Sequence, residues 1–198
     1  MPRRSDVSEI RKNQILDAAM AVFARLGFHE ARMDDIVQAS GLSKGALYWY
    51  FKSKEDIITA ISQRLFTMDI EQLEGMLAME GPVSERLLQL TQARVQGLQR
   101  MSEMIPILFE FYAAAVHQEQ VRQFIAAYFQ QFHALLEALI QQGIDRGEFR
   151  AVNVTEAASA LDALFEGLVM HWIVDPHATH WNELGQNAVR LLLDGLKR

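Results

Sequence analysis

The chain has 198 residues, of which 50% are hydrophobic, with 19 Lys and Arg against 25 Asp and Glu and no cysteine. This length favours one large domain or two small ones, and the lack of cysteine excludes a disulfide scaffold, a thiolate metal site and a cysteine nucleophile. No apolar core follows the N-terminal arginines, and no run of about 18 apolar residues is free of charge. We therefore expect neither a signal peptide nor a membrane span, and a cytoplasmic protein.

Charge is distributed unevenly along the chain. Residues 1–54 carry nine Lys and Arg against six Asp and Glu, a net charge of +3, whereas residues 55–198 carry ten against nineteen, a net charge of −9. A small basic region joined to a larger acidic one is typical of a DNA-reading module attached to a domain with another task. We therefore expect two domains, residues 1–53 and residues 54–198.

The first predicted helix covers residues 8–27 and ends at Gly27. Its apolar residues recur with helical spacing and form one face of an amphipathic helix. These residues are Ile15, Ala19, Val22, Phe23 and Leu26. A shorter helix is predicted over residues 34–40, with Asp34 and Asp35 in its first turn, where the helix dipole favours negative charge.

A tight turn joins this second helix to a third. Gly41 is suited to the left-handed conformation that ends a helix, and Ser43 is suited to cap the next one, which runs from Lys44 to about Tyr50. Leu47 is the main inward residue of this third helix, and its other sides are polar and aromatic. Three helices with a glycine turn between the last two fit a helix-turn-helix, although a small three-helix bundle shows the same spacing.

The remainder of the chain also has helical spacing. Ser53 and Asp56 predict a capped start for a helix that continues to about Met79, and Asn153 with Glu156 predicts another. The other predicted helices cover residues 83–102, 105–118, 119–145, 154–174 and 181–196. No segment shows sustained period-two alternation, so we predict an all-α fold of nine helices without a sheet.

Residues 23–56 resemble the signature of the TetR family of bacterial transcriptional regulators. The resemblance covers about the first quarter of the chain at the level of sequence. The residues that carry it are Gly27-Phe28, Asp35-Ile36, Gly41-Leu42-Ser43-Lys44-Gly45, Leu47-Tyr48-Trp49-Tyr50-Phe51-Lys52 and Lys54-Glu55. The resemblance implies an N-terminal three-helix DNA-binding domain and a C-terminal helical domain that binds a ligand and dimerises. It also implies a homodimer whose two third helices enter successive major grooves of an operator.

Carried over residue by residue, the resemblance implies a set of DNA-contacting positions. They are Ser43, Lys44, Gly45, Tyr48, Trp49, Lys52 and Lys54, and Arg32 is a further candidate because it stands beside Met33. Lysines neutralise phosphates and release counterions, a tyrosine bonds a phosphate and contacts a thymine methyl, and glycine allows close backbone approach.

Two features of this N-terminal region leave alternatives open. Met33 stands where the family usually has Thr or Ser, so the phosphate contact at that position is in doubt, and Arg32 either compensates for it or is only solvated. Arg3 and Arg4 either reach a minor groove or belong to a solvated tail.

The acidic region offers candidate effector contacts. If the plan of the family holds, a mostly apolar cavity lies among helices four to eight and suits a lipophilic or aromatic effector. The candidate lining residues are Phe109, Tyr112, Phe124, Tyr128, His133, Asp162, Glu166 and Met170. The alternative is that the aromatic residues form core and that the polar ones are surface or salt-bridged residues.

The last two predicted helices are candidates for a dimer interface. Apolar residues line one side of each, and two such helices from each protomer make a four-helix bundle. The candidate interface residues are Leu161, Leu164, Leu168, Trp172, Trp181, Leu184, Ala188 and Leu192. The alternative is that both helices bury these residues in their own core.

The sequence thus predicts a ligand-responsive transcriptional regulator, most simply a repressor released from a palindromic operator. A regulator without a small effector and an activator are the alternatives. Motifs of nucleotide-binding, hydrolytic and di-iron enzymes are missing, so no enzyme activity is expected. His171, His177 and His180 near Asp175 match no established metal spacing, so neither a metal nor a cofactor is expected.

Overall fold

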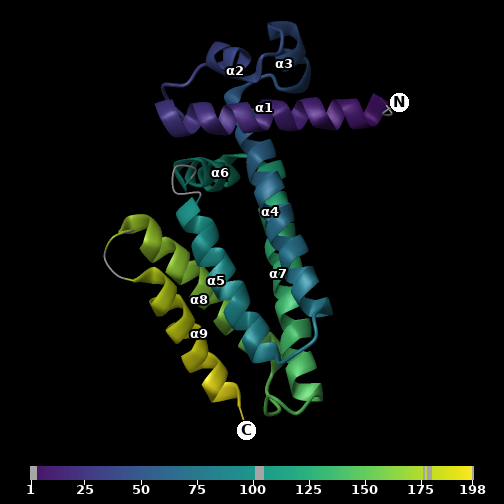
Figure 1. Cartoon of the computed structure of the whole chain (residues 1–198), viewed down its shortest axis with the longest axis vertical. Helices are drawn as coiled ribbons and strands as arrows, with labels where there is room; N and C mark the ends of the chain where they lie inside the picture. The colour runs from purple at the N-terminus through teal and green to yellow at the C-terminus, as the bar shows by residue number, and fades with distance from the viewer. Residues whose placement is uncertain (1–3, 101–104, 176, 178–179, 198) are drawn as a thin grey trace. The chain divides into compact units, whose positions relative to one another are not determined.

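The computed structural model describes residues 4–100, 105–175, 177 and 180–197. Within these residues it contains nine α-helices and no strand (Figure 1). The helices are α1 (Arg4–Leu26), α2 (Met33–Ser40), α3 (Lys44–Tyr50), α4 (Lys54–Ala78), α5 (Val83–Arg100), α6 (Ile105–His117), α7 (Glu119–Asp145), α8 (Val154–Val174) and α9 (Trp181–Leu196). The all-α prediction is confirmed, and only the start of α1 differs clearly, because the polar residues before Ser8 show no apolar periodicity.

The chain divides into two compact units. Unit 1 contains residues 1–67 and 103–123, and unit 2 contains residues 68–102 and 124–198. The boundaries fall inside α4 and near the start of α7. These units are defined by packing and differ from the two functional domains expected from the sequence, residues 1–53 and 54–198. The functional boundary after residue 53 stays a prediction.

The first three helices of unit 1 pack around a small core. Ile15, Ile36 and Leu47 are fully buried and come one from each helix. Gly41 has a φ of 67°, the left-handed conformation predicted for the turn after α2. The Ser43 hydroxyl accepts a hydrogen bond from the Ala46 backbone N–H at 3.2 Å, so α3 is capped as predicted.

The start of α4 is held by two local devices. Asp56 N–H donates to the Ser53 hydroxyl at 3.1 Å, and Ser53 N–H donates to the Asp56 carboxylate at 3.2 Å, which is the predicted capping box. The Lys54 ammonium donates to the carbonyls of Phe28 at 2.7 Å and His29 at 3.1 Å. These contacts tie α4 to the loop that follows α1.

In unit 2, α5, α8 and α9 lie side by side (Figure 1). The close approach of α9 to α5 depends on Gly185, because a Cβ there would lie 3.3 Å from a methyl group of Val95. Gly143 on α7 is required more strictly, since a Cβ there would lie 2.3 Å from the Phe149 ring. Both glycines permit contacts that no other residue allows without movement.

Arg86 on α5 is 2% exposed and holds the C-terminal end of α4. Its guanidinium donates to the carbonyls of Met76 at 2.8 Å and Met79 at 3.1 Å, and to the side-chain oxygen of Gln142. The last carbonyls of a helix have no partner within the helix. Arg86 therefore supplies hydrogen bonds that the end of α4 lacks.

One described helix, α8, is long and apolar enough to span a membrane, with a mean hydropathy of 1.3 over an 18-residue window. It nevertheless carries Asp162 and Glu166 and packs against α5 and α9. Carboxylates in the middle of a spanning helix are costly in lipid. The composition of α8 therefore fits a helix packed within the protein.

Candidate nucleic-acid interface and effector site

Helix α3 presents four of the predicted DNA-contacting residues on its outer sides. Lys44 and Gly45 are exposed, Tyr48 is half-buried and Trp49 is 69% exposed. The Trp49 ring packs edge-on against the Tyr50 ring, with a centroid distance of 4.6 Å, so the exposed indole has a defined support. The structure thus brings a cation, a bare backbone position and two aromatic rings together on one short helix.

Lys44 is paired with Asp34 from the first turn of α2. The ammonium lies 2.7 Å from the carboxylate, and both side chains are mainly exposed. The hydrogen bond from Lys44 and the charge of Asp34 raise the pKa of Lys44 above its usual value, so the lysine stays charged at neutral pH. An exposed pair of this kind is weak, and a phosphate is able to replace Asp34 as the partner of Lys44.

The other three predicted basic contacts have local structural roles. Lys52 donates to the carbonyl of Tyr48 and so caps α3, while two carbonyls occupy the Lys54 ammonium. Arg32 is exposed at the N-cap of α2, where its backbone N–H donates to the Asp35 carboxylate at 2.8 Å. Asp35 therefore closes the start of α2, next to Met33, which has no hydroxyl to offer.

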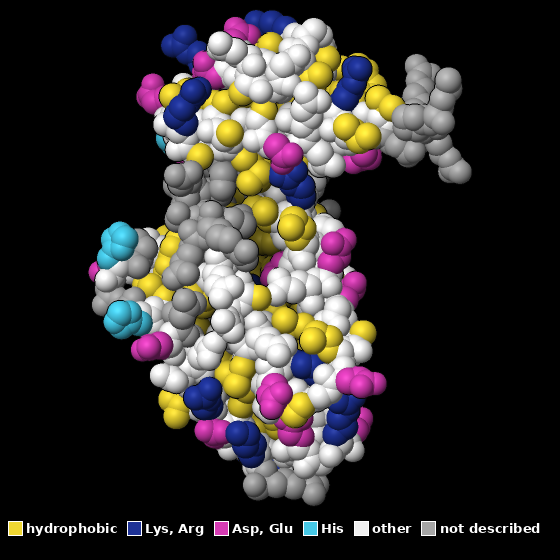
Figure 2. Space-filling model, in the orientation of Figure 1, with side chains coloured by type: hydrophobic (Ala, Val, Ile, Leu, Met, Phe, Trp, Pro, Cys, Tyr) yellow, Lys and Arg dark blue, Asp and Glu magenta, His cyan; other side chains and the backbone are white. Residues whose placement is uncertain are grey.

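The surface of unit 1 shows no single basic patch on the face drawn in Figure 2, where Lys and Arg side chains lie beside Asp and Glu side chains. Within unit 1, Lys44 is likewise paired with a carboxylate, that of Asp34. The side chains of Arg3 and Arg4 lie outside the described residues, so the choice between a minor-groove contact and a solvated tail stays open.

Replacing Gly45 by alanine is expected to separate DNA binding from folding. A Cβ at Gly45 would meet no atom within 4 Å, and alanine is the better helix former by about 1 kcal/mol. We expect an unchanged or higher melting temperature and about tenfold weaker operator binding, because the methyl group occupies the space that DNA needs. Thermal unfolding and fluorescence anisotropy measure the two effects, and unchanged operator affinity would show that α3 does not approach DNA at Gly45.

The interior of unit 2 contains a buried arginine that the sequence analysis did not identify. The Arg94 side chain is 13% exposed. Its guanidinium lies between two rings, 4.5 Å from the centroid of Phe132 and 5.1 Å from that of Phe165. A flat cation between two ring faces is a favourable arrangement in a desolvated site.

Carboxylates surround this guanidinium. Arg94 lies 3.5 Å from Asp69 and 3.7 Å from Glu166, and the Tyr128 hydroxyl donates to Asp69 at 2.5 Å. A buried oxygen of Asp162 has no hydrogen-bond partner among the described residues. We refer to Asp69, Arg94, Tyr128, Asp162 and Glu166 as the Arg94 cluster.

Burial changes the acid–base behaviour of the Arg94 cluster. Desolvation raises the pKa of Glu166 and that of Asp162, and the positive charge of Arg94 opposes this only in part. Desolvation likewise raises the pKa of Tyr128, which stays protonated and keeps its role as a hydrogen-bond donor. The cluster therefore places two carboxyl groups that resist ionisation, those of Asp162 and Glu166, beside one guanidinium.

Replacing Asp162 by asparagine is expected to stabilise the protein at neutral pH. Burial raises the pKa of Asp162 in the folded state above its value in the unfolded chain. As the pH rises past the usual carboxylate pKa, the unfolded chain loses the Asp162 proton before the folded protein does. The free energy of unfolding therefore falls as the pH rises through this range. We expect D162N to have the higher melting temperature at pH 7, with a difference that disappears near about pH 4. Melting curves against pH measure this effect; Glu183→Gln, at an exposed carboxylate of α9, is the control, and a difference that grows in acid would contradict it.

The structure groups only some of the predicted effector residues. Tyr128, Asp162 and Glu166 belong to the Arg94 cluster, whereas His133 hydrogen-bonds or pairs with Ser159 and Glu137. Phe109 and Tyr112 lie in unit 1, Phe124 is half-buried in unit 2, and Met170 is 52% exposed.

Arg94 and Asp69 were not predicted, but the sequence contains a signal for Arg94. It continues the buried spacing of Leu87 and Leu90 on α5, and a cation on the apolar face of an amphipathic helix requires buried partners.

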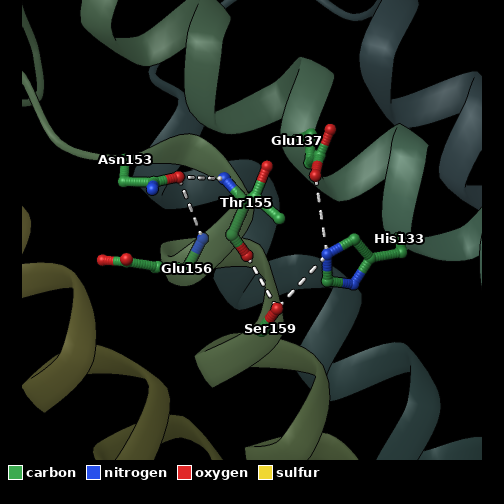
Figure 3. Close-up of polar contacts among 6 residues, drawn as sticks. All are labelled: His133, Glu137, Asn153, Thr155, Glu156 and Ser159. Atoms are coloured by element: carbon green, nitrogen blue, oxygen red, sulfur yellow. Dashed lines mark hydrogen bonds and ion pairs between the residues drawn. The ribbon is translucent and has the colours of Figure 1, made fainter.

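A second polar group in unit 2 joins α7 to the start of α8 (Figure 3). His133 Nε2 lies 3.4 Å from the Ser159 hydroxyl and 3.6 Å from Glu137, and the same hydroxyl donates to the Thr155 carbonyl at 2.7 Å. A hydrolytic triad needs serine and carboxylate on opposite nitrogens of the histidine, whereas here one nitrogen faces both. Asn153 caps α8 through Thr155 and Glu156, as predicted.

The predicted interface residues on α8 and α9 are not equally exposed. Leu161, Trp172 and Trp181 are at most 7% exposed and lie in the core of unit 2, so they contribute to their own core rather than to an outer face. Leu164, Leu168, Ala188 and Leu192 are half-buried, and Leu184 is 42% exposed. Further exposed apolar side chains on these helices are Met170, Val174 and Leu191.

In the described part of the chain, no three His, Asp or Glu residues form a group able to hold a metal.

Comparison with known proteins agrees with this arrangement. Residues 15–61 match the family of bacterial regulatory proteins described as the tetR family, and residues 83–196 match the C-terminal domain of BetI-type transcriptional repressors. The uncharacterized HTH-type transcriptional regulator YfiR of Bacillus subtilis (strain 168) is 32% identical over 147 residues, which are 72% of this chain and 70% of that protein.

Two solved structures share the fold. The regulator FadR from Bacillus subtilis, in complex with stearoyl-CoA, has a TM-score of 0.71 and 23% identity, covering 93% of this chain and 98% of that one. A transcriptional regulator from Saccharomonospora viridis, in complex with choline, has a TM-score of 0.80 and 21% identity, covering 96% and 99%. The matches to both halves of the chain place it in the TetR family of bacterial transcriptional regulators.

Proposed function

We propose that this protein is a ligand-responsive transcriptional repressor of the cytoplasm, which binds a palindromic operator as a homodimer. The observation that carries this proposal is helix α3, with its exposed Lys44, Gly45 and Trp49 supported by the buried Leu47. A short helix that is apolar inside and cationic and aromatic outside is suited to enter a major groove.

We further propose that a small lipophilic or aromatic effector releases the repressor from DNA. The Arg94 cluster supports an effector site in unit 2. Buried charges without full pairing destabilise the folded state, and such groups are concentrated at functional sites. The two related structures hold an acyl-CoA and choline. These two ligands differ in chemistry, so the class of effector has to be inferred from the residues of this chain and not from its relatives.

Release requires two conformations of the dimer. In the operator-bound conformation, the two α3 helices lie about 34 Å apart, one turn of DNA. An effector that binds the other conformation better shifts the population toward it. By linkage, operator DNA must weaken effector binding by the same factor. Equal operator affinity at zero and saturating effector would reject this mechanism.

A regulator without a small effector is the second candidate, and one observation favours it. The cavity among α5, α8 and α9 has a volume of about 20 Å³, room for about one water molecule. Whether the protein activates or represses depends on where the operator lies relative to a promoter. A reporter gene with the operator in its natural position distinguishes an activator from a repressor.

Selection of bound sequences from random duplex DNA tests the proposal. The expected product has two inverted half-sites with centres about one helical turn, or a multiple of it, apart. A product without two-fold symmetry would reject the dimer arrangement. Failure to retain any duplex at low ionic strength would reject DNA binding altogether.

Replacing Leu191 by lysine is expected to weaken the dimer. Leu191 on α9 is 76% exposed, so a lysine there leaves the core of unit 2 intact and places a charge in the proposed apolar interface. Sedimentation velocity should show a monomer at concentrations where the parent is a dimer. Val116→Lys is the matched control, because Val116 on α6 is also 76% exposed. Equal behaviour of the two variants would place the interface elsewhere.

A further inference from the structure

The first half of α4 holds α1 at two separate places within unit 1 (Figure 1). Lys54, at the start of α4, donates to two carbonyls of the loop that follows α1. Arg64, ten residues further along α4, contacts the middle of α1. Its Nη1 lies 2.8 Å from the Asp17 carboxylate, and its Nη2 donates to the Met20 sulfur at 2.9 Å. Because ten residues of a helix span about 15 Å, the two contacts are well separated along α4.

The contact made by Arg64 has a defined geometry. Asp17 and Met20 lie one turn apart on α1, so the two arms of the planar guanidinium meet the same face of that helix. The Arg64 side chain is only 26% exposed, so its ion pair is screened by water less than a fully exposed pair. This contact therefore resists rotation of α1 relative to α4.

Hydrophobic packing alone does not fix the direction in which α1 crosses α4. Between Lys54 and Arg64, α4 carries three buried apolar residues, Ile57, Ile58 and Ile61. Their burial stabilises the contact between helices, but the hydrophobic effect is non-directional. A hold at Lys54 alone leaves α1 free to turn about that end. A second hold at Arg64, about 15 Å away, removes this freedom.

The direction of α1 decides where α3 lies on α4, because α1, α2 and α3 form one packed head. Ile15, Ile36 and Leu47, one from each helix, are fully buried in a shared core. The side-chain amide of Gln14 on α1 also donates to the Ser40 carbonyl at the end of α2, at 2.7 Å. Any turn of α1 on α4 is therefore passed on to α3.

We propose that Arg64 is a positioning residue for operator binding. Its contact with Asp17 and Met20 fixes the direction of the head on α4 and so sets the spacing of half-sites that the dimer accepts. In this role Arg64 does not contact DNA. This inference rests on the proposed function as a dimeric operator-binding protein, and it adds a residue outside the predicted DNA-contacting set.

Duplexes that differ only in the spacing of their half-sites test the inference. The three probes are the operator selected for the parent protein, the same operator with one base pair inserted between its half-sites, and a duplex with a single half-site. One inserted base pair moves the half-sites apart by about 3.4 Å and turns them by about 34°. The parent, with its α3 helices fixed, should bind the inserted operator at least about tenfold more weakly than the selected one.

Arg64→Met removes both contacts and keeps most of the apolar stem. We expect its affinity for the selected operator to fall at least about threefold, because a smaller fraction of dimers holds both α3 helices at the required spacing. The penalty for the inserted base pair should also fall at least about threefold. Affinity for the single half-site should stay within about twofold, since one α3 helix needs no spacing. Fluorescence anisotropy measures all three affinities.

Salt dependence separates a positioning residue from a phosphate contact. R64M should leave the slope of log affinity against log salt concentration unchanged, whereas loss of a phosphate contact lowers it. Asp17→Asn removes the same ion pair from the other side, at a side chain that is 68% exposed, and should reduce the insertion penalty in the same direction. The effects of R64M and D17N should not add in the double variant. Arg146→Met, at an exposed arginine of unit 2, is the control and should keep the insertion penalty.

Two results would overturn the positioning role. Equal weakening on the single half-site and on the selected operator, or a lower salt slope, would show that Arg64 acts at the DNA itself. An unchanged insertion penalty would show that its contact with α1 does not set the spacing; if R64M does not fold, the exposed substitution D17N decides this point. Failure of the parent to bind any duplex would instead reject the proposed function, so the two failures are distinguishable.

Discussion

Replacing Lys44 by alanine is expected to weaken operator binding by about tenfold in each half-site, and so by about a hundredfold for the dimer. Lys44 is exposed at the first position of α3, and its only described ion pair is the weak surface contact with Asp34. Two fewer phosphate contacts should also reduce the slope of log affinity against log salt concentration by about two. Fluorescence anisotropy at several salt concentrations measures both quantities.

Asp34→Asn is the matched control for this experiment. Removing the carboxylate frees Lys44 and takes a negative charge away from the phosphates, so operator affinity should rise by about threefold. In the double variant the gain should disappear in part, because the two residues act through one contact. If K44A changed the dimerisation constant instead of operator affinity, α3 would not be the helix that enters the groove.

Replacing Arg86 by methionine is expected to lower the free energy of unfolding by about 3 kcal/mol. Arg86 is 2% exposed and donates to the carbonyls at the end of α4 and to Gln142. Methionine fills much of the same space but donates no hydrogen bond, so these buried acceptors lose their partner. Urea unfolding at a fixed protein concentration measures the change, since the stability of a dimer depends on concentration.

Arg146→Met is the control for this loss. Arg146 donates to the Gly81 carbonyl at 3.0 Å but is exposed, so water replaces the lost hydrogen bond and the change should stay within about 0.5 kcal/mol. Equal losses for the two variants would show that removal of positive charge, and not the buried contact at the end of α4, is responsible. Neither substitution touches α3, so operator affinity of the folded protein should be unchanged.

The helices of this protein were predictable because their signals are local. Apolar spacing, Gly41 in the turn, and the caps at Ser43, Ser53 and Asn153 act within a few residues, and each is found in the structure. The start of α2 was less predictable. The carboxylate of Asp35, within the helix, accepts a hydrogen bond from the Arg32 backbone N–H, whereas most helix caps come from the side chain of the residue before the helix.

The effector region was predictable only as a set of candidates. Glu166 and Asp162 are candidates because they are carboxylates within an apolar run. Phe109 and Tyr112 come from an aromatic run that was also a candidate, but they lie in unit 1, apart from the Arg94 cluster of unit 2. Periodicity shows which face of a helix is apolar and not which helix covers it. The same limit explains Trp172 and Trp181, which fit an outer interface by spacing and are buried by their own unit.

By itself, the sequence determined the all-α class, the order of the helices with their bounds apart from the start of α1, and the cap at the start of α3. Tertiary structure alone decided that Arg94 lies against two phenylalanine rings, that its Nη1 has no hydrogen-bond partner among the described residues, and that Gly185 lets α9 lie close to α5. The physical reason is range. Helix formation and capping depend on neighbours along the chain, whereas burial and pairing of a charge depend on residues brought from distant positions by packing.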